Sequence, residues 1–514
     1  MILTWLVFLP AIGGALAWIA AGFNRDLARW VAMAACAAVL GMTLGIWRGA
    51  GGALFGGAPF LEHDVAWVIP FGIRYHLAMD GLSLLLCALT GLLGVVAVAA
   101  SWREIDTRVG AFHFALLALL SGVLGVFLAF DLFLFYFFWE LMLIPMYLVI
   151  AIWGHEERIA AALKFFIFTF AGGLLMLLAI LGVYFAHGAA TGVYTFDLPL
   201  LVGTPIAPHL AFWLMFGFFV AFAVKLPAVP IHSWLPDAHT QAPTAGSIIL
   251  AGVMLKTGAY GFLRFAVPLF PAASAALAEG ARILGVAGIL YGAFMAYAQP
   301  DLKRLVAYTS ISHLGFVLLG IYAGTPLALG GAVMGMIAHG LSTGALFMMA
   351  GIIQERCHTR AFARLGGLWA TAPRLGGFTL FFALAALGLP GLADFIAELL
   401  VLVGTFQVSP VLAIIGSGGL VVSVIYALRL VQDSVLGPNR HGWRLPDLNA
   451  REVATLGVLA ALLIYLGLRP APVLDASRAP LETVRRSLAG GVRPEQVRAA
   501  PPPGPPPAVW EVEK

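Results

Sequence analysis

The stretch KLPAVPIHSWLPDAHTQAPTAGSIILAGVMLK, residues 225–256, decides the fold of this chain. It begins with Lys225 at the end of the apolar run AFWLMFGFFVAFAV and ends with Lys256 inside a second apolar run. An ammonium group is costly in hydrocarbon, so such a lysine faces a protein interior or a wet cavity and is a functional candidate. Pro227 and Pro230 lack the backbone N–H that a helix needs, so the helix carrying Lys225 is expected to break there.

A helix break at membrane depth is tolerated only where it lines a cavity or is buried in protein. Transporters use broken helices with ionisable groups near the bilayer midplane to build ion sites. Residues 225–256 therefore predict an ion path through the middle of a membrane protein.

The composition agrees, because 61% of the 514 residues are hydrophobic and 11% are charged, whereas soluble domains carry about 25% charged residues. The net charge is +4, and no basic run resembles a nucleic-acid patch. Cys36, Cys87 and Cys357 are isolated, and the sequence has neither a CxxC motif nor a Cys/His cluster. We therefore expect no cofactor and no metal on this chain.

Apolar runs of about 20 residues predict an all-α polytopic membrane protein with about fourteen membrane-spanning helices. The expected ranges are 2–22, 28–47, 78–100, 111–130, 132–153, 160–187, 209–231, 244–267, 282–298, 304–323, 327–353, 374–405, 411–436 and 451–468. The runs at 160–187 and 374–405 exceed a straight span, which predicts helices that are tilted, kinked or extended beyond the bilayer. The first run follows Met1 without a basic segment or cleavage site, so we expect a retained span.

The distribution of Lys and Arg predicts the orientation. We number each loop by the predicted span that it follows. Lys and Arg concentrate in the odd-numbered loops, whereas the even-numbered loops and their edges hold Arg48, Arg74 and Arg282. Positive loops stay in the cytoplasm, so both termini are expected outside. The tail after Arg469 is also rich in arginine, against this trend, and its PPPGPPP run at 501–507 predicts an extended, poorly ordered terminus.

A short internal repeat is present. FFVAFAVKLP (218–227) aligns without gaps on FFALAALGLP (381–390). The two copies cross the membrane in opposite directions, which is typical of an inverted repeat with two Pro-broken helices. The predicted organisation is N-terminal helices (1–110), a first antiporter-like repeat (111–267), a second inverted repeat (282–436), a last spanning helix (437–468) and a Pro/Arg-rich tail (469–514).

Glu140 and Lys225 are candidate partners for a proton switch. Glu140 lies in the apolar run FLFYFFWELMLIPMYLVI. Burial disfavours a charged group and a nearby opposite charge favours it, so making or breaking the pair changes whether Lys225 holds its proton. The alternatives are a protonated Glu140 held by a hydrogen bond, and a Lys225 that reaches the membrane interface from its helix end.

Other ionisable residues lie in or between the apolar runs. Lys256 and Arg264 are about two helical turns apart and share a face. Histidine titrates near physiological pH and can relay protons through water, although a plain hydrogen-bonded histidine is the alternative at each position. The histidines concerned are His232, His239, His313 and His339, and their spacing matches no metal-ligand motif.

Glu398 and Asp394 lie four residues apart in LADFIAELLVLVG and therefore share a helix face. Two carboxylates that close favour one shared proton, so Asp394 is a candidate modulator of Glu398. Alternatively, Asp394 caps the broken half-helix. Asp131, at the start of the fifth span, is predicted to be an N-cap, and Arg429 to be a structural counter-ion.

At these residues the chain resembles the proton-translocating family of antiporter-like membrane subunits. Residues 225–264 match that family's central motif almost throughout. The stretches YHLAMDGLSLLLCALT (75–90) and FYFFWELMLIPMYLVIAIWGHEERIAAALKFFIF (135–168) narrow the resemblance to the subunit M family of bacterial NADH:quinone oxidoreductase, complex I. DLKRLVAYTSISHLG (301–315) and IAHGLSTGALFMMAG (337–351) fit as well. The long lateral helix of the related subunit L is absent, and Glu398 stands where subunits L and N carry lysine.

The resemblance implies protonatable groups across the middle of the bilayer, moving protons while partner subunits transfer electrons from NADH to quinone. The matching positions are Glu140, Lys225, Lys256 and Glu398, linked through water by His232, His313 and His339. The resemblance places NADH, FMN, iron–sulfur clusters and quinone in partner subunits. It implies that subunits L and N are the neighbours of this chain in the bacterial inner membrane, and both termini are expected in the periplasm. This chain departs from the family at Asp394, where a neutral residue is usual, and at Ala397, where glycine is usual.

Two alternatives come from other classes. One is a cation/proton antiporter subunit of the Mrp D type or a membrane subunit of a membrane-bound hydrogenase, which neighbouring genes would distinguish. The other is a structural module without transport, which loss of Glu140, Lys225 or Lys256 would have favoured.

Overall fold

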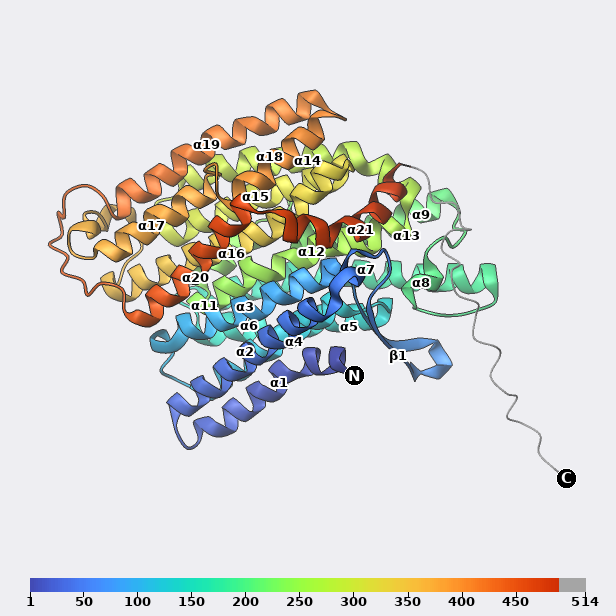
Figure 1. Cartoon of the computed structure of the whole chain (residues 1–514), viewed down its shortest axis with the longest axis horizontal. Coiled ribbons are helices and arrows are strands. Elements are labelled where there is room, and N and C mark those ends of the chain that lie inside the picture. Colours follow the sequence, from blue (N-terminus) through green and yellow to red (C-terminus); the bar gives the residue numbers. More distant parts are fainter. Residues whose placement is uncertain (490–514) are drawn as a thin grey trace.

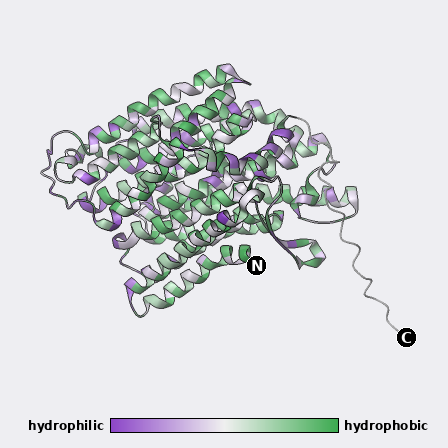
Figure 2. Cartoon of the chain, viewed as in Figure 1, coloured by the Kyte–Doolittle hydropathy of each residue, from purple (hydrophilic) through white to green (hydrophobic). Residues whose placement is uncertain are grey.

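Long apolar runs fold into helices because a helix satisfies its own backbone hydrogen bonds, which is the condition for crossing lipid. The computed structural model describes residues 1–489, and in this range thirteen helices are long and apolar enough to span a membrane. The predicted PPPGPPP terminus at 501–507 lies outside the described residues. Hydrophobic residues run along the lengths of the helices, and many of the hydrophilic residues gather toward their ends (Figure 2).

The spanning helices agree with thirteen of the fourteen predicted runs. They are α1 (Ile2–Ala21), α2 (Arg25–Ala50), α3 (Gly81–Glu104), α4 (Val109–Leu128), α5 (Leu132–Leu141) continued by α6 (Leu143–Trp153), α7 (Arg158–Thr191), α9 (Pro208–Lys225), the segment Thr244–Leu269, α14 (Pro271–Ala298), α15 (Leu302–Ala323), α16 (Pro326–Cys357), α19 (Pro410–Ser434) and α20 (Ala450–Leu468).

The fourteenth run, 374–405, is divided into α17 (Pro373–Ala386) and α18 (Ala393–Phe406). The break falls at GLPG, where Gly388 and Gly391 have φ values of +78° and +96°, a region that glycine enters without steric cost. The kink predicted in this run is confirmed.

The predicted break after Lys225 is confirmed as well. Helix α9 ends at Lys225, and α10 (Trp234–Gln241) begins only after Pro227 and Pro230. Both broken helices finish with a backbone bond that reaches back five residues, from Ala228 N to Ala223 O and from Leu389 N to Leu384 O. The two bonds have the same span but are displaced by two residues from one another in the alignment of the repeat.

The helices nearest the centre of the bundle are fully enclosed. The most apolar windows of the segment 244–269, of α15 and of α16 are 100% buried, whereas those of α2 and α20 are 33% buried. In Figure 1, α1 lies along the lower edge and α19 along the upper edge, with α3, α12, α15 and α16 between them. The side chains in these windows of the central helices are therefore buried within the chain.

A β-hairpin follows α2 and was not predicted. Strands β1 (Leu61–Val68) and β2 (Ile73–Met79) pair antiparallel with Leu61 opposite Met79, and η2 (Ile69–Phe71) closes the turn. The hairpin lies at the same end of the bundle as the N-terminus and α8 (Leu198–Leu201), opposite the loop between α19 and α20 (Figure 1). Three short turns complete the connections: η1 (Gly51–Phe55), η5 (Phe362–Arg364) and η6 (Leu368–Ala370).

The segment assigned to a Pro/Arg-rich tail begins with a helix that we did not predict from the sequence. This helix is α21 (Ala471–Leu488), which packs on α16 and α3. Val473, Ala476, Leu481 and Val484 are its buried apolar residues, and their spacing places them on one face of a helix. Burial of this face offsets the low apolar content of the segment as a whole.

Candidate proton path

Lys256 is enclosed at the centre of the bundle between two π-helical turns. It lies on α12 (Leu255–Gly261), between η3 (Leu250–Met254) and η4 (Phe262–Ala266), and its exposed fraction is 0%. Its Nζ donates to the carbonyl of Ala251 in η3 and lies 2.6 Å from Nδ1 of His339 on α16. Single π turns inside α-helices often mark functional sites, and here the turn supplies the lysine with an acceptor.

From His339 the row of polar groups continues to Glu398. The rings of His339 and His313 are 5.6 Å apart between centroids, and His313 Nδ1 lies 3.0 Å from Glu398 Oε1. The structure thus brings together four predicted site residues from the 244–269 segment, α16, α15 and α18.

A small cavity lies beside this row. Its volume is about 10 Å³, and its polar lining comes from His313, His339, Asp394 and Glu398. Nε2 of each histidine, Oδ2 of Asp394 and Oε2 of Glu398 are buried and have no hydrogen-bond partner. A space of this volume with several polar neighbours suits one water molecule.

Asp394 faces this cavity from the first turn of α18. Ser342 Oγ on α16 donates to its Oδ1 at 3.0 Å, and α18 has no side-chain cap. The alternative that Asp394 caps the broken half-helix is therefore not supported.

Lys225 and Glu140, the predicted switch pair, are not joined by an ion pair. Lys225 Nζ is buried without a hydrogen-bond partner, 5.3 Å from the ring of Trp139 and 5.6 Å from that of Phe165. Glu140 Oε1 is also unpartnered and points at α7, where a Cβ on Gly173 would lie 2.0 Å away. No hydrogen bond or ion pair therefore links the two side chains in this structure.

The helix that carries Lys256 packs directly against the helix that ends at Lys225. A Cβ at Gly258 would lie 2.6 Å from the carbonyl oxygen of Phe222 on α9, so only glycine permits this approach. His232 lies in the turn after α9, with its ring 4.9 Å from that of Tyr291 and its Nδ1 unpartnered. Nothing bonds His232 to the row that starts at Lys256.

Arg264 shares no partner with Lys256. Its NH2 lies 2.5 Å from Asp80 Oδ2, and its Nε donates to Tyr260 Oη at 3.1 Å. Asp80 also caps α3 by accepting from Ser83 N. We did not identify Asp80 from the sequence, although an aspartate just before an apolar run is a helix-start signal. The pair ties two helices together and lies apart from the row.

Two structural predictions are supported. Asp131 accepts from Phe133 N and Leu134 N at 2.9 Å, as an N-cap does. Arg429 pairs with Asp433 one turn away at 3.2 Å. In residues 1–489, no group of three or more His, Cys, Asp or Glu side chains could hold a metal ion.

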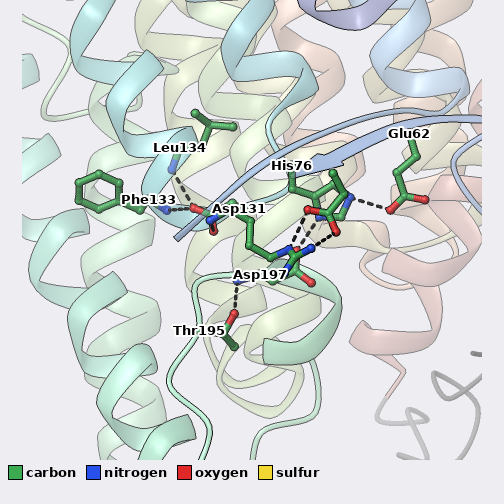
Figure 3. Close-up of polar contacts among 9 residues, drawn as sticks. Glu62, His76, Asp131, Phe133, Leu134, Thr195 and Asp197 are labelled. Carbon is green, nitrogen blue, oxygen red and sulfur yellow. Dashed lines mark hydrogen bonds and ion pairs between the residues drawn. The ribbon is translucent and has the colours of Figure 1, made fainter. Parts of the chain in front are cut away.

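A second titratable cluster lies outside the spanning helices, beside Asp131 (Figure 3). His76 on β2 lies between two carboxylates, with Nδ1 2.6 Å from Asp197 Oδ1 and Nε2 2.7 Å from Glu62 Oε1. Burial alone would lower the pKa of His76, but the hydrogen bond and charge of Asp197, with the charges of Asp64 and Glu62, raise it above its ordinary value. The cluster fastens the hairpin to the loop before α9.

Comparison with known proteins gives consistent results. The family model described as "NADH:quinone oxidoreductase/Mrp antiporter, TM" matches residues 129–425. The NADH-quinone oxidoreductase subunit M of Pseudomonas aeruginosa is 53% identical over 499 residues, covering 95% of this chain and 98% of that protein. A chain of respiratory complex I from Thermus thermophilus with bound NADH superposes with a TM-score of 0.84 at 32% identity, covering 95% of this chain and 99% of that one. A chain of the Mrp complex from Dietzia has a TM-score of 0.80 at 25% identity, covering 93% of this chain and 52% of that one.

Proposed function

Because this chain belongs to the NADH-quinone oxidoreductase subunit M family, we propose that its buried protonatable side chains carry protons across the membrane. Electron transfer from NADH to quinone in partner subunits drives the movement. The observation that carries this proposal is the row Lys256, His339, His313 and Glu398, enclosed within helices that span the membrane.

Each member of the row can gain and lose one proton. The ammonium of Lys256 donates toward Nδ1 of His339, and an imidazole that takes a proton on one nitrogen releases one from the other. Nε2 of His339 faces the cavity shared with His313, Asp394 and Glu398. A proton that leaves Lys256 can therefore reach Glu398 through His339 and the small cavity that His339 and Glu398 both line.

Glu140 and Lys225 supply the switch. Closing the gap between them favours the charged lysine, and opening it favours release of a proton toward the neighbouring helix that carries Lys256. Moving one proton against 100 mV costs about 2.3 kcal/mol, and a swing of about 2 pKa units supplies about 2.7 kcal/mol. One such switch is therefore adequate in scale.

The assembly proposed is that of the family. NADH, FMN, the iron–sulfur clusters and quinone belong to partner subunits, and the antiporter-like subunits L and N are the neighbours in the membrane. The Lys and Arg distribution supports a bacterial inner membrane orientation with both termini in the periplasm. The Mrp-type alternative has weaker support, because the Mrp chain is much less similar in sequence than the subunit M relative.

The test is Lys225→Ala in the assembled complex, reconstituted in vesicles with NADH and quinone. Proton pumping, followed with a pH-sensitive dye, should fall by roughly tenfold or more, since proton transfer by a positioned group contributes at least that much. The subunit composition on a native gel should be unchanged. Near wild-type pumping by an assembled Lys225→Ala complex contradicts the proposed path.

A further inference from the structure

Three protonatable side chains outside the row converge on the turn between α10 and the next helix, α11 (Thr244–Ile249). Lys303 Nζ, from α15, donates to the carbonyl of Ala242. The carboxylate of Glu104, at the end of α3, accepts from Thr244 N at 3.0 and 3.1 Å. His239 lies in the last turn of α10, three residues before Ala242. The backbone of one short turn therefore holds all three groups together.

Lys303 is as deeply buried as Lys256, with an exposed fraction of 0%. Its bond to Ala242 occupies one of the three donors of an ammonium group. Glu104 binds the same turn, and Arg360, which pairs with Asp301 at 2.7 Å, donates to the carbonyl of Thr240 just before that turn. An enclosed lysine facing both signs of charge is suited to exchange a proton.

His239 connects this group with the row. It is 0% exposed, and both ring nitrogens lack a hydrogen-bond partner. Its ring stacks on Phe347 at 4.4 Å with an interplanar angle of 15°, which fixes the plane in which the nitrogens point. Phe347 lies on α16, about two helical turns from His339 on the same helix, so the ring of His239 packs against the helix that binds Lys256. A buried polar group left unpaired destabilises a fold, so a function that uses the free nitrogens accounts for its presence.

A small cavity borders Glu104 at the end of the bundle opposite the hairpin (Figure 1). Its volume is about 10 Å³, and its polar lining comes from Glu104, Thr244, Glu355, Arg451 and Glu452. Glu104 ends α3 and Glu452 begins α20, so the cavity lies where these helices reach the far end of the bundle.

We propose that Glu104, Lys303 and His239 form a proton-uptake branch that leads from this cavity to Lys256. The branch rests on the proposed function and adds a supply route to the same row. A proton bound by the Glu104 carboxylate passes to the neutral amine of Lys303, and then to one ring nitrogen of His239. The imidazolium releases a proton from its other nitrogen toward Lys256, so each step breaks one bond to hydrogen and forms one.

Lys303→Arg separates proton transfer from structure. A guanidinium keeps the positive charge and can donate to Ala242 O, but it does not give up its proton in proteins. If Lys303 only stabilises the fold, Lys303→Met should lose pumping and Lys303→Arg should pump like the wild type. If Lys303 carries protons, both variants assemble and pump roughly tenfold or more slowly. The loss should grow as the pH is raised, because uptake then draws on fewer protons.

His239→Gln and Glu104→Gln give independent readings should Lys303→Arg fail to assemble, since an amide can hydrogen bond but cannot carry a proton. Both should show the same pH-dependent loss. Arg304→Lys is the matched control, because Arg304 is the next residue, is half-exposed and pairs with Asp237 at 3.1 Å. It should pump like the wild type at every pH.

Lys225→Ala, measured in the same vesicles, separates the two proposals. Loss of pumping in Lys225→Ala together with wild-type pumping in Lys303→Arg and His239→Gln overturns the branch alone. Wild-type pumping in Lys225→Ala overturns the proposed path itself. The branch is also overturned if Lys303→Met loses pumping equally at all pH values while Lys303→Arg pumps like the wild type. That result would mark a structural role for Lys303.

Discussion

Lys256 Nζ lies 2.6 Å from Nδ1 of His339 in the enclosed centre of the bundle. A charged ammonium can only donate, so Nδ1 is the acceptor in that state and the ring carries its proton on Nε2. His339 lines the cavity together with Asp394 and Glu398, and its Nε2 is buried without a hydrogen-bond partner. The contact therefore gives the proton of Lys256 a direction, through the ring and toward α18.

His339→Gln tests this direction. The amide can still accept from Lys256, but it cannot pass a proton from one side to the other. Pumping should fall by roughly tenfold or more while the complex assembles normally. His113→Gln is the control, because His113 is equally buried in a spanning helix but bonds only to the Val109 carbonyl. Equal pumping by the two variants would show that His339 is not a carrier.

Glu140→Gln should resemble Lys225→Ala, because a neutral amide cannot bias the protonation of Lys225. The amide is nearly isosteric with the carboxyl, so it fits beside Gly173, where space is tight. Glu140→Asp keeps the charge about one methylene away and should pump at an intermediate rate. The measurement is the ratio of protons pumped to NADH oxidised. A wild-type ratio in Glu140→Gln would remove Glu140 from the path.

The sequence was sufficient to predict most of the fold and the row of ionisable groups. Membrane-spanning helices are recognised by long apolar runs. Pro227 and Pro230 mark the helix break after Lys225, and the GLPG motif marks the break between α17 and α18. A charge in such a run is rare enough to stand out, which is why Lys225, Lys256, Glu140 and Glu398 were identified. The length of the apolar runs and the cost of a charged group in lipid therefore predict the main features of the fold and of the candidate path.

What the sequence left out depends on contacts between distant residues. Ser342 beside Asp394, and Asp80 beside Arg264, are brought together by packing that no local pattern encodes. The absence of an ion pair between Glu140 and Lys225 depends on the directions of their side chains, which the sequence does not specify. The hairpin was missed because its strands are short and lie between stronger hydrophobic signals, and α21 because its apolar residues occupy one narrow face.

The contact of His76 with Asp197 predicts a pH dependence outside the membrane. The folded pKa of His76 is raised above its unfolded value of about 6.5. Its contribution to stability is therefore fully present below that unfolded value and is lost as the pH rises through the folded pKa. Hydrogen exchange of residues 73–79, corrected for intrinsic rates, should speed up over this window. In His76→Gln the corrected rates should be independent of pH, and a persisting pH dependence there would assign the effect to another group.

Asp394 and Glu398 give the sharpest test, because the sequence resemblance leads us to expect a neutral residue where Asp394 stands. Both carboxyls border one cavity, and each has one oxygen without a partner. Asp394→Asn keeps an acceptor for Ser342 and removes the like charge beside Glu398. Pumping should persist, with its pH optimum moved to lower values. Glu398→Gln should cut pumping by roughly tenfold or more, because His313 loses its carboxylate partner.

The two single variants and the double variant are compared by pumping against pH and by infrared difference spectra during turnover. A carboxyl that changes protonation gives a carboxylic-acid band, which should vanish when that residue becomes an amide. Ser342→Ala should shift the Asp394 band without removing it, because that hydroxyl donates to Oδ1. An unchanged pH profile in Asp394→Asn would reduce Asp394 to a packing residue. Full pumping in Glu398→Gln that is lost only in the double variant would mean that the two carboxyls share one function, since either could then receive the proton that crosses the cavity from His339.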